Sequence, residues 1–157
     1  MMNSYISFLA SSFLILLIGC SANDESKKLM QGFKSHTDYQ YLISNSSDSE
    51  VWKILEHTKN EDERPKYDLL VAETDIRLQE RIDGRTVLTY FNNRLMEVRF
   101  YPDVQSTQVD SLTTFDSMKE SEGVRCWVAT DIVEKIFFAC EEVVLSKEHR
   151  KWLRKYS

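Results

Sequence analysis

The clearest pattern in the chain is an alternation of apolar and polar residues between residues 75 and 101. Asp83-Gly84 is a dipeptide that type I′ turns prefer, and Asn92-Asn93 is a second pair that can adopt positive φ. Folding the chain at both pairs predicts three antiparallel strands, whose register is set because a shift of one residue would scatter the apolar set over both faces. The predicted apolar face comprises Ile76, Leu78, Ile82, Val87, Phe91, Met96, Val98 and Phe100.

The opposite face of these strands is a candidate for binding. Planar guanidinium groups beside aromatic rings can hold carboxylates, phosphates or the backbone of a partner. Two alternatives stay open, namely a solvated face with ordinary cross-strand pairs and a face covered by a helix. The residues predicted to bind a partner are Arg77, Arg81, Tyr90, Arg99 and Tyr101.

A second pattern lies at the N-terminus, where residues 8–19 (FLASSFLILLIG) contain no charge. This run is shorter than the roughly 20 residues that a spanning helix needs, and it suits the apolar region of a signal peptide. Leu17-Ile18-Gly19-Cys20 resembles the lipobox of bacterial lipoproteins. An uncleaved apolar anchor and a core helix are the alternatives.

The lipoprotein resemblance implies a processing scheme. Residues 1–19 are then a signal peptide, and Cys20 carries a diacylglycerol and a further acyl chain such as palmitate. Ser21 after the cysteine implies delivery to the outer membrane, with the protein facing the periplasm. Residues 20–36 are polar enough to form a tether, which leaves residues 37–157 as a single domain.

The two remaining cysteines, Cys126 and Cys140, form an even pair in a chain that is expected to be exported, so we predict a disulfide between them. Apolar and aromatic residues around both cysteines favour two strands. Opposing the cysteines across a hairpin pairs Val128 with Phe138 and Thr130 with Ile136. Because both faces of this hairpin are apolar, we expect it to be buried on both sides.

Further elements complete an α+β prediction. A helix is expected at residues 49–56, a strand at 68–72 and a second helix at 109–122. The predicted fold is an antiparallel meander sheet with flanking helices and a disulfide-linked C-terminal hairpin.

The C-terminal tail is basic, because residues 147–155 carry a net charge of +4 while the rest of the chain carries −9. Ser146 is a suitable helix cap, and Leu145, Trp152, Leu153 and Tyr156 can share one apolar side. Such a helix either rests on an anionic lipid surface or docks on the domain through Trp152 with its charges solvated. The candidate membrane contacts are Arg150, Lys151, Trp152, Arg154 and Lys155.

Composition and motifs limit the chemistry. The chain has 157 residues, 42% of them hydrophobic, and a net charge of −5, which suits one globular domain and argues against nucleic-acid binding. None of the local signatures of common hydrolases is present, and the three histidines have no metal-ligand spacing. We therefore expect no catalytic activity, no metal and no cofactor.

The function that these observations favour is a non-catalytic, lipid-anchored binding protein of the bacterial envelope, acting on a protein partner as an assembly accessory, inhibitor or immunity-type protein. One alternative is a structural envelope lipoprotein whose basic tail contacts the membrane surface. Another is an enzyme with a dispersed site, which a cleft that gathers His57 with two carboxylates would favour.

Overall fold

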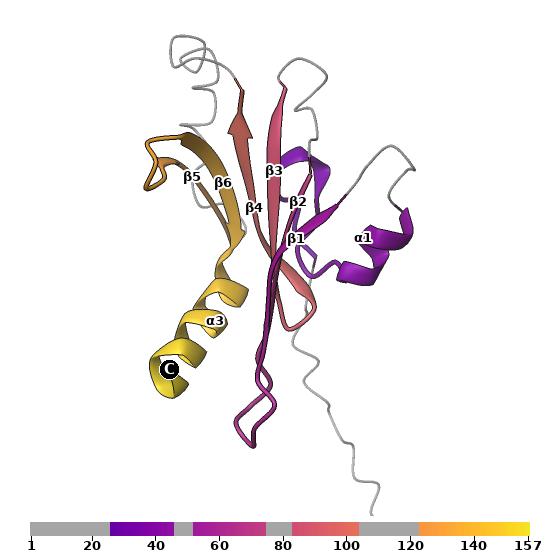
Figure 1. Ribbon diagram of the computed structural model, residues 1–157, viewed down its shortest axis with the longest axis vertical. Coiled ribbons are helices and arrows are strands. Elements are labelled where there is room, and N and C mark those ends of the chain that lie inside the picture. The colour runs from indigo at the N-terminus through magenta and orange to yellow at the C-terminus, as the bar shows by residue number, and fades with distance from the viewer. Residues whose placement is uncertain (1–25, 46–51, 75–82, 104–122) are drawn as a thin grey trace, which may run out of the picture.

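A six-stranded antiparallel sheet organises the computed structural model, which describes residues 26–45, 52–74, 83–103 and 123–157. The strand order is β1-β2-β3-β4-β6-β5, so the chain runs as a meander through β4, and β6 then lies between β4 and β5 (Figure 1). The α+β prediction with a meander sheet and a disulfide-linked C-terminal hairpin is confirmed. The strands are β1 (Lys53–Lys59), β2 (Asp68–Thr74), β3 (Gly84–Phe91), β4 (Arg94–Pro102), β5 (Val124–Thr130) and β6 (Ile136–Glu142).

Among the described residues, three helices accompany the sheet. The 3-10 helix η1 (Met30–Gly32) and the α-helix α1 (Tyr39–Asn45) precede β1, and α3 (Val143–Tyr156) follows β6 directly. In Figure 1, α1 and α3 lie on opposite sides of the sheet. We call the side toward residues 26–45 the N-terminal face and the other side the α3 face.

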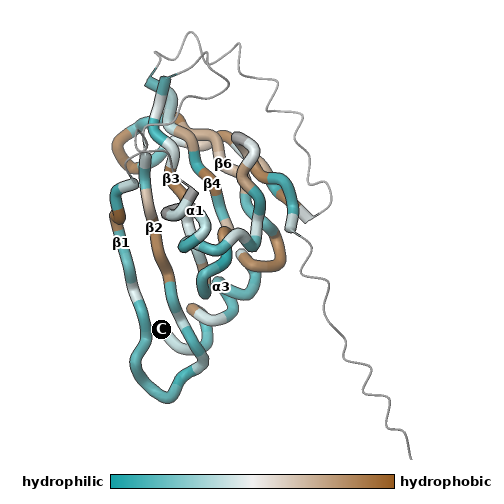
Figure 2. Tube along the Cα trace, turned by 90° about the vertical axis from the view of Figure 1, so that its right-hand side faces the viewer, coloured by the Kyte–Doolittle hydropathy of each residue, from teal (hydrophilic) through white to brown (hydrophobic). Residues whose placement is uncertain are grey.

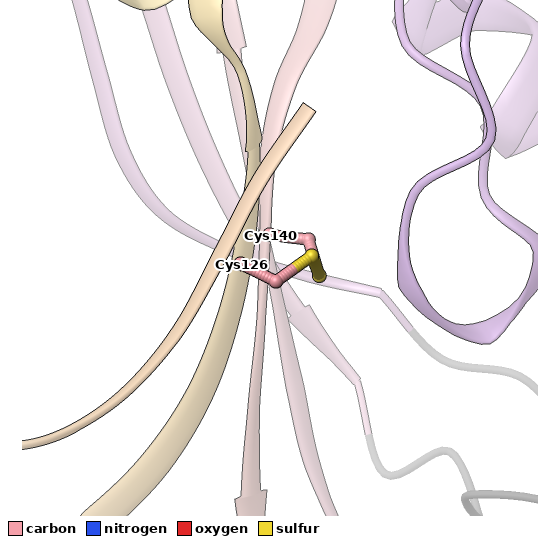
Figure 3. The surroundings of a disulfide bond; sticks show 2 residues. All are labelled: Cys126 and Cys140. Carbon is pink, nitrogen blue, oxygen red and sulfur yellow. A yellow bond between two sulfur atoms is a disulfide. The ribbon is translucent and has the colours of Figure 1, made fainter. Parts of the chain in front are cut away.

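The predicted C-terminal hairpin is confirmed in its register. Cys126 lies opposite Cys140 and forms the disulfide (Figure 3). Val128 lies opposite Phe138, and Thr130 lies opposite Ile136. The side chain of Asp131 accepts hydrogen bonds from the backbone N–H groups of Val133 and Lys135, at 3.0 and 2.9 Å, which closes the loop. The expected burial on both sides is wrong, because β5 is an edge strand and its Val128 is 43% exposed.

The Asn92-Asn93 turn is also confirmed, with φ of 50° and 65°. The predicted register beyond it is wrong, however, because a bulge interrupts the pairing of β3 with β4. Tyr90 pairs with Leu95, but Thr89 pairs with Glu97, so that Met96 is the extra residue. The bulge turns Val98 and Phe100 to the same face as Leu88 and Tyr90.

Two further elements differ from their predictions. The partner of β3 on its other side is β2, with Thr74 opposite Thr86, so Asp83-Gly84 is not a two-residue hairpin turn and the expected strand at 75–82 lies outside the described residues. Residues 53–56, expected as the end of a helix at 49–56, belong to β1 instead, while the expected strand at 68–72 is confirmed within β2. The helix expected at 109–122 lies outside the described residues.

The N-terminal face carries the larger core. Leu88, Tyr90 and Phe100 are at most 1% exposed there, and Leu29 and Met30 pack against them from the segment that precedes α1. The apolar residues of β2, β3, β4 and β6 appear brown in Figure 2, whereas the edge strand β1 is mostly hydrophilic. Leu29 and Met30 are core residues although they belong to residues 20–36, the predicted tether.

A smaller core holds α3 on the other face. Leu145, Trp152 and Leu153 pack against Tyr67, Phe91 and Met96. The indole N–H of Trp152 donates to the carbonyl of Pro65 at 2.9 Å. The expected cap Ser146 lies inside α3, and Glu142 is the N-cap, since its carboxylate accepts from the backbone N–H of Leu145 at 2.6 Å.

Candidate functional site: an arginine–aromatic surface, a basic helix and a polar cleft

Three arginines and three aromatic residues alternate on the α3 face of the sheet. Arg85 lies over Tyr101 at 4.7 Å, Arg99 over Phe137 at 5.5 Å, and Arg125 over Trp127 at 5.5 Å, each measured from guanidinium carbon to ring centroid. The Tyr101 and Phe137 rings are 5.3 Å apart, which joins the first two pairs. We call these six residues the arginine–aromatic surface.

Each guanidinium group of the arginine–aromatic surface forms an ion pair with a carboxylate. Glu73 pairs with Arg85 at 3.0 Å, Glu97 pairs with Arg99, and Glu141 pairs with Arg125. The Glu97 and Glu141 side chains are 8% and 5% exposed, whereas the three arginines keep 39%, 40% and 48% of their side-chain area accessible. The arginines are therefore held in place while their outer edges face solvent.

Glu97 and Glu141 are opposite each other on β4 and β6. Burial raises the pKa of Glu97, and the neighbouring Glu141 raises it further, while the ion pair and hydrogen bond with Arg99 lower it. Glu141 has two additional partners, because Ser146 Oγ donates to it at 2.6 Å and Arg150 lies 3.8 Å away. The buried carboxylates thus depend on the arginines above them.

The structure brings together only part of the predicted binding set. Arg99 and Tyr101 belong to the arginine–aromatic surface, but Tyr90 is 1% exposed on the opposite face, since the Met96 bulge changes which residues share a side. Arg77 and Arg81 lie outside the described residues. Sequence reasoning missed Arg85, Arg125, Trp127 and Phe137, although the spacing Arg125-x-Trp127 on a strand already places both side chains on one face.

The second candidate is a basic stripe on α3. Its side chains are spaced three or four residues apart, which brings them to one side of the helix. They line one depression of about 530 Å³ and comprise Lys147, Arg150, Lys151, Arg154 and Lys155. Leu145, Trp152 and Leu153 occupy the opposite side of the helix, against the sheet. Of the predicted membrane contacts, Arg150, Lys151, Arg154 and Lys155 therefore share the stripe, while Trp152 packs on Tyr67 with ring centroids 4.3 Å apart.

The third candidate is a polar cleft of about 270 Å³ on the N-terminal face. Tyr39 of α1, His57 and Lys59 of β1, and Asp68 of β2 are among its lining residues, and Tyr90 of β3 is another. His57 Nε2 lies 3.0 Å from Asp68 Oδ1, and Lys59 Nζ lies 3.6 Å from Asp68 Oδ2. Among the described residues that line the cleft, Asp68 is the one carboxylate near His57. A cleft that gathers His57 with two carboxylates is therefore not found there.

Burial raises the pKa of the Tyr90 phenol far above its usual value, and nearby Tyr39 and Asp38 raise it further. The hydroxyl therefore stays protonated.

Within the described part of the chain, no helix is long and apolar enough to span a membrane. The same residues contain no group of three or more His, Cys, Asp or Glu side chains that could hold a metal ion.

The comparisons with known proteins add no relative. No protein-family model, curated protein or solved structure matches this chain. The functional argument accordingly rests on the residues themselves.

Proposed function

We propose that this chain is a non-catalytic, lipid-anchored binding protein of the bacterial envelope, and that it recognises a protein partner through the arginine–aromatic surface. The observation that carries the proposal is the support of each exposed guanidinium by an aromatic ring and by a carboxylate beneath it. Side chains that are already ordered lose little conformational entropy when a partner binds. Arginine and aromatic residues are also the side chains most enriched in binding hot spots.

The envelope location draws support from two features. The Cys126–Cys140 disulfide suits an oxidising compartment, where such bonds persist. Leu17-Ile18-Gly19-Cys20 resembles a lipobox, which would make Cys20 the acylated residue. Metabolic labelling with radioactive palmitate tests this part: we expect label in the wild-type chain and none in Cys20→Ala, whereas equal labelling of both would refute the anchor.

Binding through the surface is tested with Arg85→Gln/Arg125→Gln. This pair leaves the fold supported, because Glu73 keeps Lys53 at 3.4 Å and Glu141 keeps Arg150 and Ser146. Arg99 is left unchanged, since Glu97 is buried beneath it. We expect quantitative capture from envelope membranes to lose a partner that the wild-type chain retains, with a drop in recovery of about tenfold or more.

The matched control removes the same amount of charge elsewhere. Lys34→Gln/Lys135→Gln also replaces two cationic residues, both exposed and outside the arginine–aromatic surface. Loss of the partner in the arginine variant together with its retention in the lysine variant supports the proposal. Equal recovery with both variants would exclude this surface as the binding site.

The basic stripe favours a second candidate function, in which α3 contacts an anionic membrane surface. Its five cations line one concave surface on the side of the helix opposite the core contacts. We expect acetylation of Lys147 and Lys151 in the full chain to be slower on phosphatidylglycerol vesicles than on phosphatidylcholine vesicles, with Lys34 and Lys135 as internal references. Equal rates on both vesicles would exclude this role.

A further inference from the structure

Tyr90, whose hydroxyl is buried, is one of the residues that line the polar cleft. Tyr90 is 1% exposed, and among the described residues its hydroxyl has no hydrogen-bond partner. The ring itself is well packed, because the Tyr39 ring meets it edge-on with centroids 5.5 Å apart. A phenylalanine would fill the same apolar space without a polar group that burial penalises. The hydroxyl is therefore a feature that a ligand in the cleft can satisfy.

The charges that line the cleft select the sign of that ligand. Lys59 and Lys66 are two cations, and Asp68 is the one carboxylate among the described lining residues. Asp68 is already occupied by His57 at 3.0 Å and Lys59 at 3.6 Å, so its charge is compensated from within. Lys66 has no acidic partner in the part of the chain that the structure describes. Asp38 also lies near Tyr90, but its carboxylate accepts hydrogen bonds from the Asn93 side chain and from the backbone N–H of Gln40. Lys66 is thus the lining cation that favours an anionic ligand.

The size of the cleft limits the ligand further. A volume of about 270 Å³ lies below the 300–1,000 Å³ that is typical of drug-sized ligands. It has room for a carboxylate together with a short chain attached to it. A carboxylate has two acceptor oxygens, one for a neutral hydroxyl donor and one for an ammonium group, and such charge-assisted hydrogen bonds are the strong ones.

We propose that this cleft binds a carboxylate, with one oxygen accepting from the Tyr90 hydroxyl and the other facing Lys66 and Lys59. The carboxylate belongs either to a small free acid or to the C-terminus of a bound polypeptide. The site is separate from the proposed partner surface, because Tyr90 lies on the N-terminal face and the arginine–aromatic surface lies on the α3 face. Failure of one proposal therefore leaves the other intact.

The test is a titration of the full chain in detergent micelles, followed by NMR of its backbone amides. The probes are acetate, N-acetylglycine, the primary amide of N-acetylglycine and inorganic phosphate. We expect saturable shifts at Tyr39, His57 and Asn93 with a carboxylate probe and none with the amide. Binding of acetate identifies a free acid, whereas binding of N-acetylglycine alone identifies a chain terminus. Phosphate binding as tight as that of the carboxylates would overturn the assignment.

Variants connect the binding to the hydroxyl. Tyr90→Phe should weaken carboxylate binding about tenfold or more, since it removes one hydrogen bond to a charged group. Lys66→Gln should also weaken it, whereas Tyr156→Phe, which removes a hydroxyl of α3 outside the cleft, should not. The thermal midpoint of Tyr90→Phe should equal or exceed that of the wild-type chain. Unchanged affinity in Tyr90→Phe would overturn the proposal, and so would a fall of several degrees in its midpoint, which would mean that the fold itself satisfies the hydroxyl.

Discussion

Cys126 and Cys140 connect the edge strand β5 to its neighbour β6 across a loop with a sequence separation of 14 residues. In the chain-entropy model, closing a loop of this size stabilises the folded state by about 3 kcal/mol. We expect Cys126→Ser/Cys140→Ser to lower the free energy of unfolding by about that amount, measured by urea denaturation. Cys20→Ser serves as the control, and an equal loss in both variants would contradict a specific role for the disulfide.

His149 provides a second prediction for a single residue. Its Nε2 lies 3.2 Å from the Tyr67 hydroxyl, and its ring packs on Phe91 at 5.1 Å, so α3 is docked partly through a half-buried imidazole. Burial lowers the pKa of His149, and the charge of Arg150 lowers it further. The unfolded chain therefore binds a proton more readily than the folded chain.

The sign of the pH effect follows from this difference. The contribution of His149 is complete above its unfolded pKa of about 6.5 and declines as the pH falls below that value. We expect the free energy of unfolding to fall more between pH 7.5 and pH 5.5 in the wild-type chain than in His149→Gln. Urea denaturation at both pH values measures the difference, and identical pH dependence in the two proteins would refute the argument.

At the scale of the elements, the Met96 bulge decides which side chains of β4 enter the core. Deletion of Met96 would join Leu95 directly to Glu97 and keep Val98 opposite Leu88 and Phe100 opposite Thr86, so both stay in the larger core. The deletion removes only the Met96 side chain from the smaller core. We therefore expect the variant to unfold cooperatively, as monitored by near-UV circular dichroism, with a free energy of unfolding lower by about 2–5 kcal/mol.

A matched substitution separates the effect of the backbone from that of the side chain. Met96→Leu keeps the bulge and approximately the same apolar volume, so it should cost less than about 1.5 kcal/mol. Loss of cooperative unfolding in the deletion variant, with its retention in Met96→Leu, would contradict the view that Met96 is the extra residue of this pairing.

The local sequence pattern predicts some of the strands but not all of them. β2 could be predicted from its short apolar run, and the C-terminal hairpin from the β-branched and aromatic residues around its two cysteines. β1 could not, since its apolar residues Ile54 and Leu55 are adjacent and its strand form depends on pairing with β2. Position at a sheet edge, with every residue of β1 exposed, also removes the alternation that signals a strand.

At the scale of the whole molecule, the boundary of the domain is a testable property. Lys27 Nζ lies 3.2 Å from the Glu142 carboxylate at the start of α3, and Leu29 and Met30 are 5% and 4% exposed. A chain that begins at residue 37 loses these contacts, whereas one that begins at residue 26 keeps them. We expect the shorter chain to lose about 4 kcal/mol of stability relative to the longer one, from burial of two large apolar side chains. Equal thermal midpoints would mean that residues 26–36 do not stabilise the domain and belong to the tether.

The candidate sites, too, could be predicted only in part from the sequence pattern. The basic stripe was visible in the sequence, because a helix brings residues three and four apart onto one side without help from the rest of the fold. Arg99 and Tyr101 could also be placed together, since they are two residues apart on one strand. The complete arginine–aromatic surface could not, because Arg85, Arg99 and Arg125 come from three different strands whose order the pattern does not contain.

Local chemistry was thus sufficient for the disulfide, its hairpin register, the Asn92-Asn93 turn and the apolar side of α3, because each depends on residues close in sequence. The tertiary structure decided the strand order, the Met96 bulge and the packing of residues 26–36, because these depend on which distant surfaces bury each other. Tyr90 illustrates the difference: a one-residue bulge in β4 brings Val98 and Phe100 to the face of Tyr90, which makes the expected binding face the core. Among the described residues its hydroxyl has no hydrogen-bond partner.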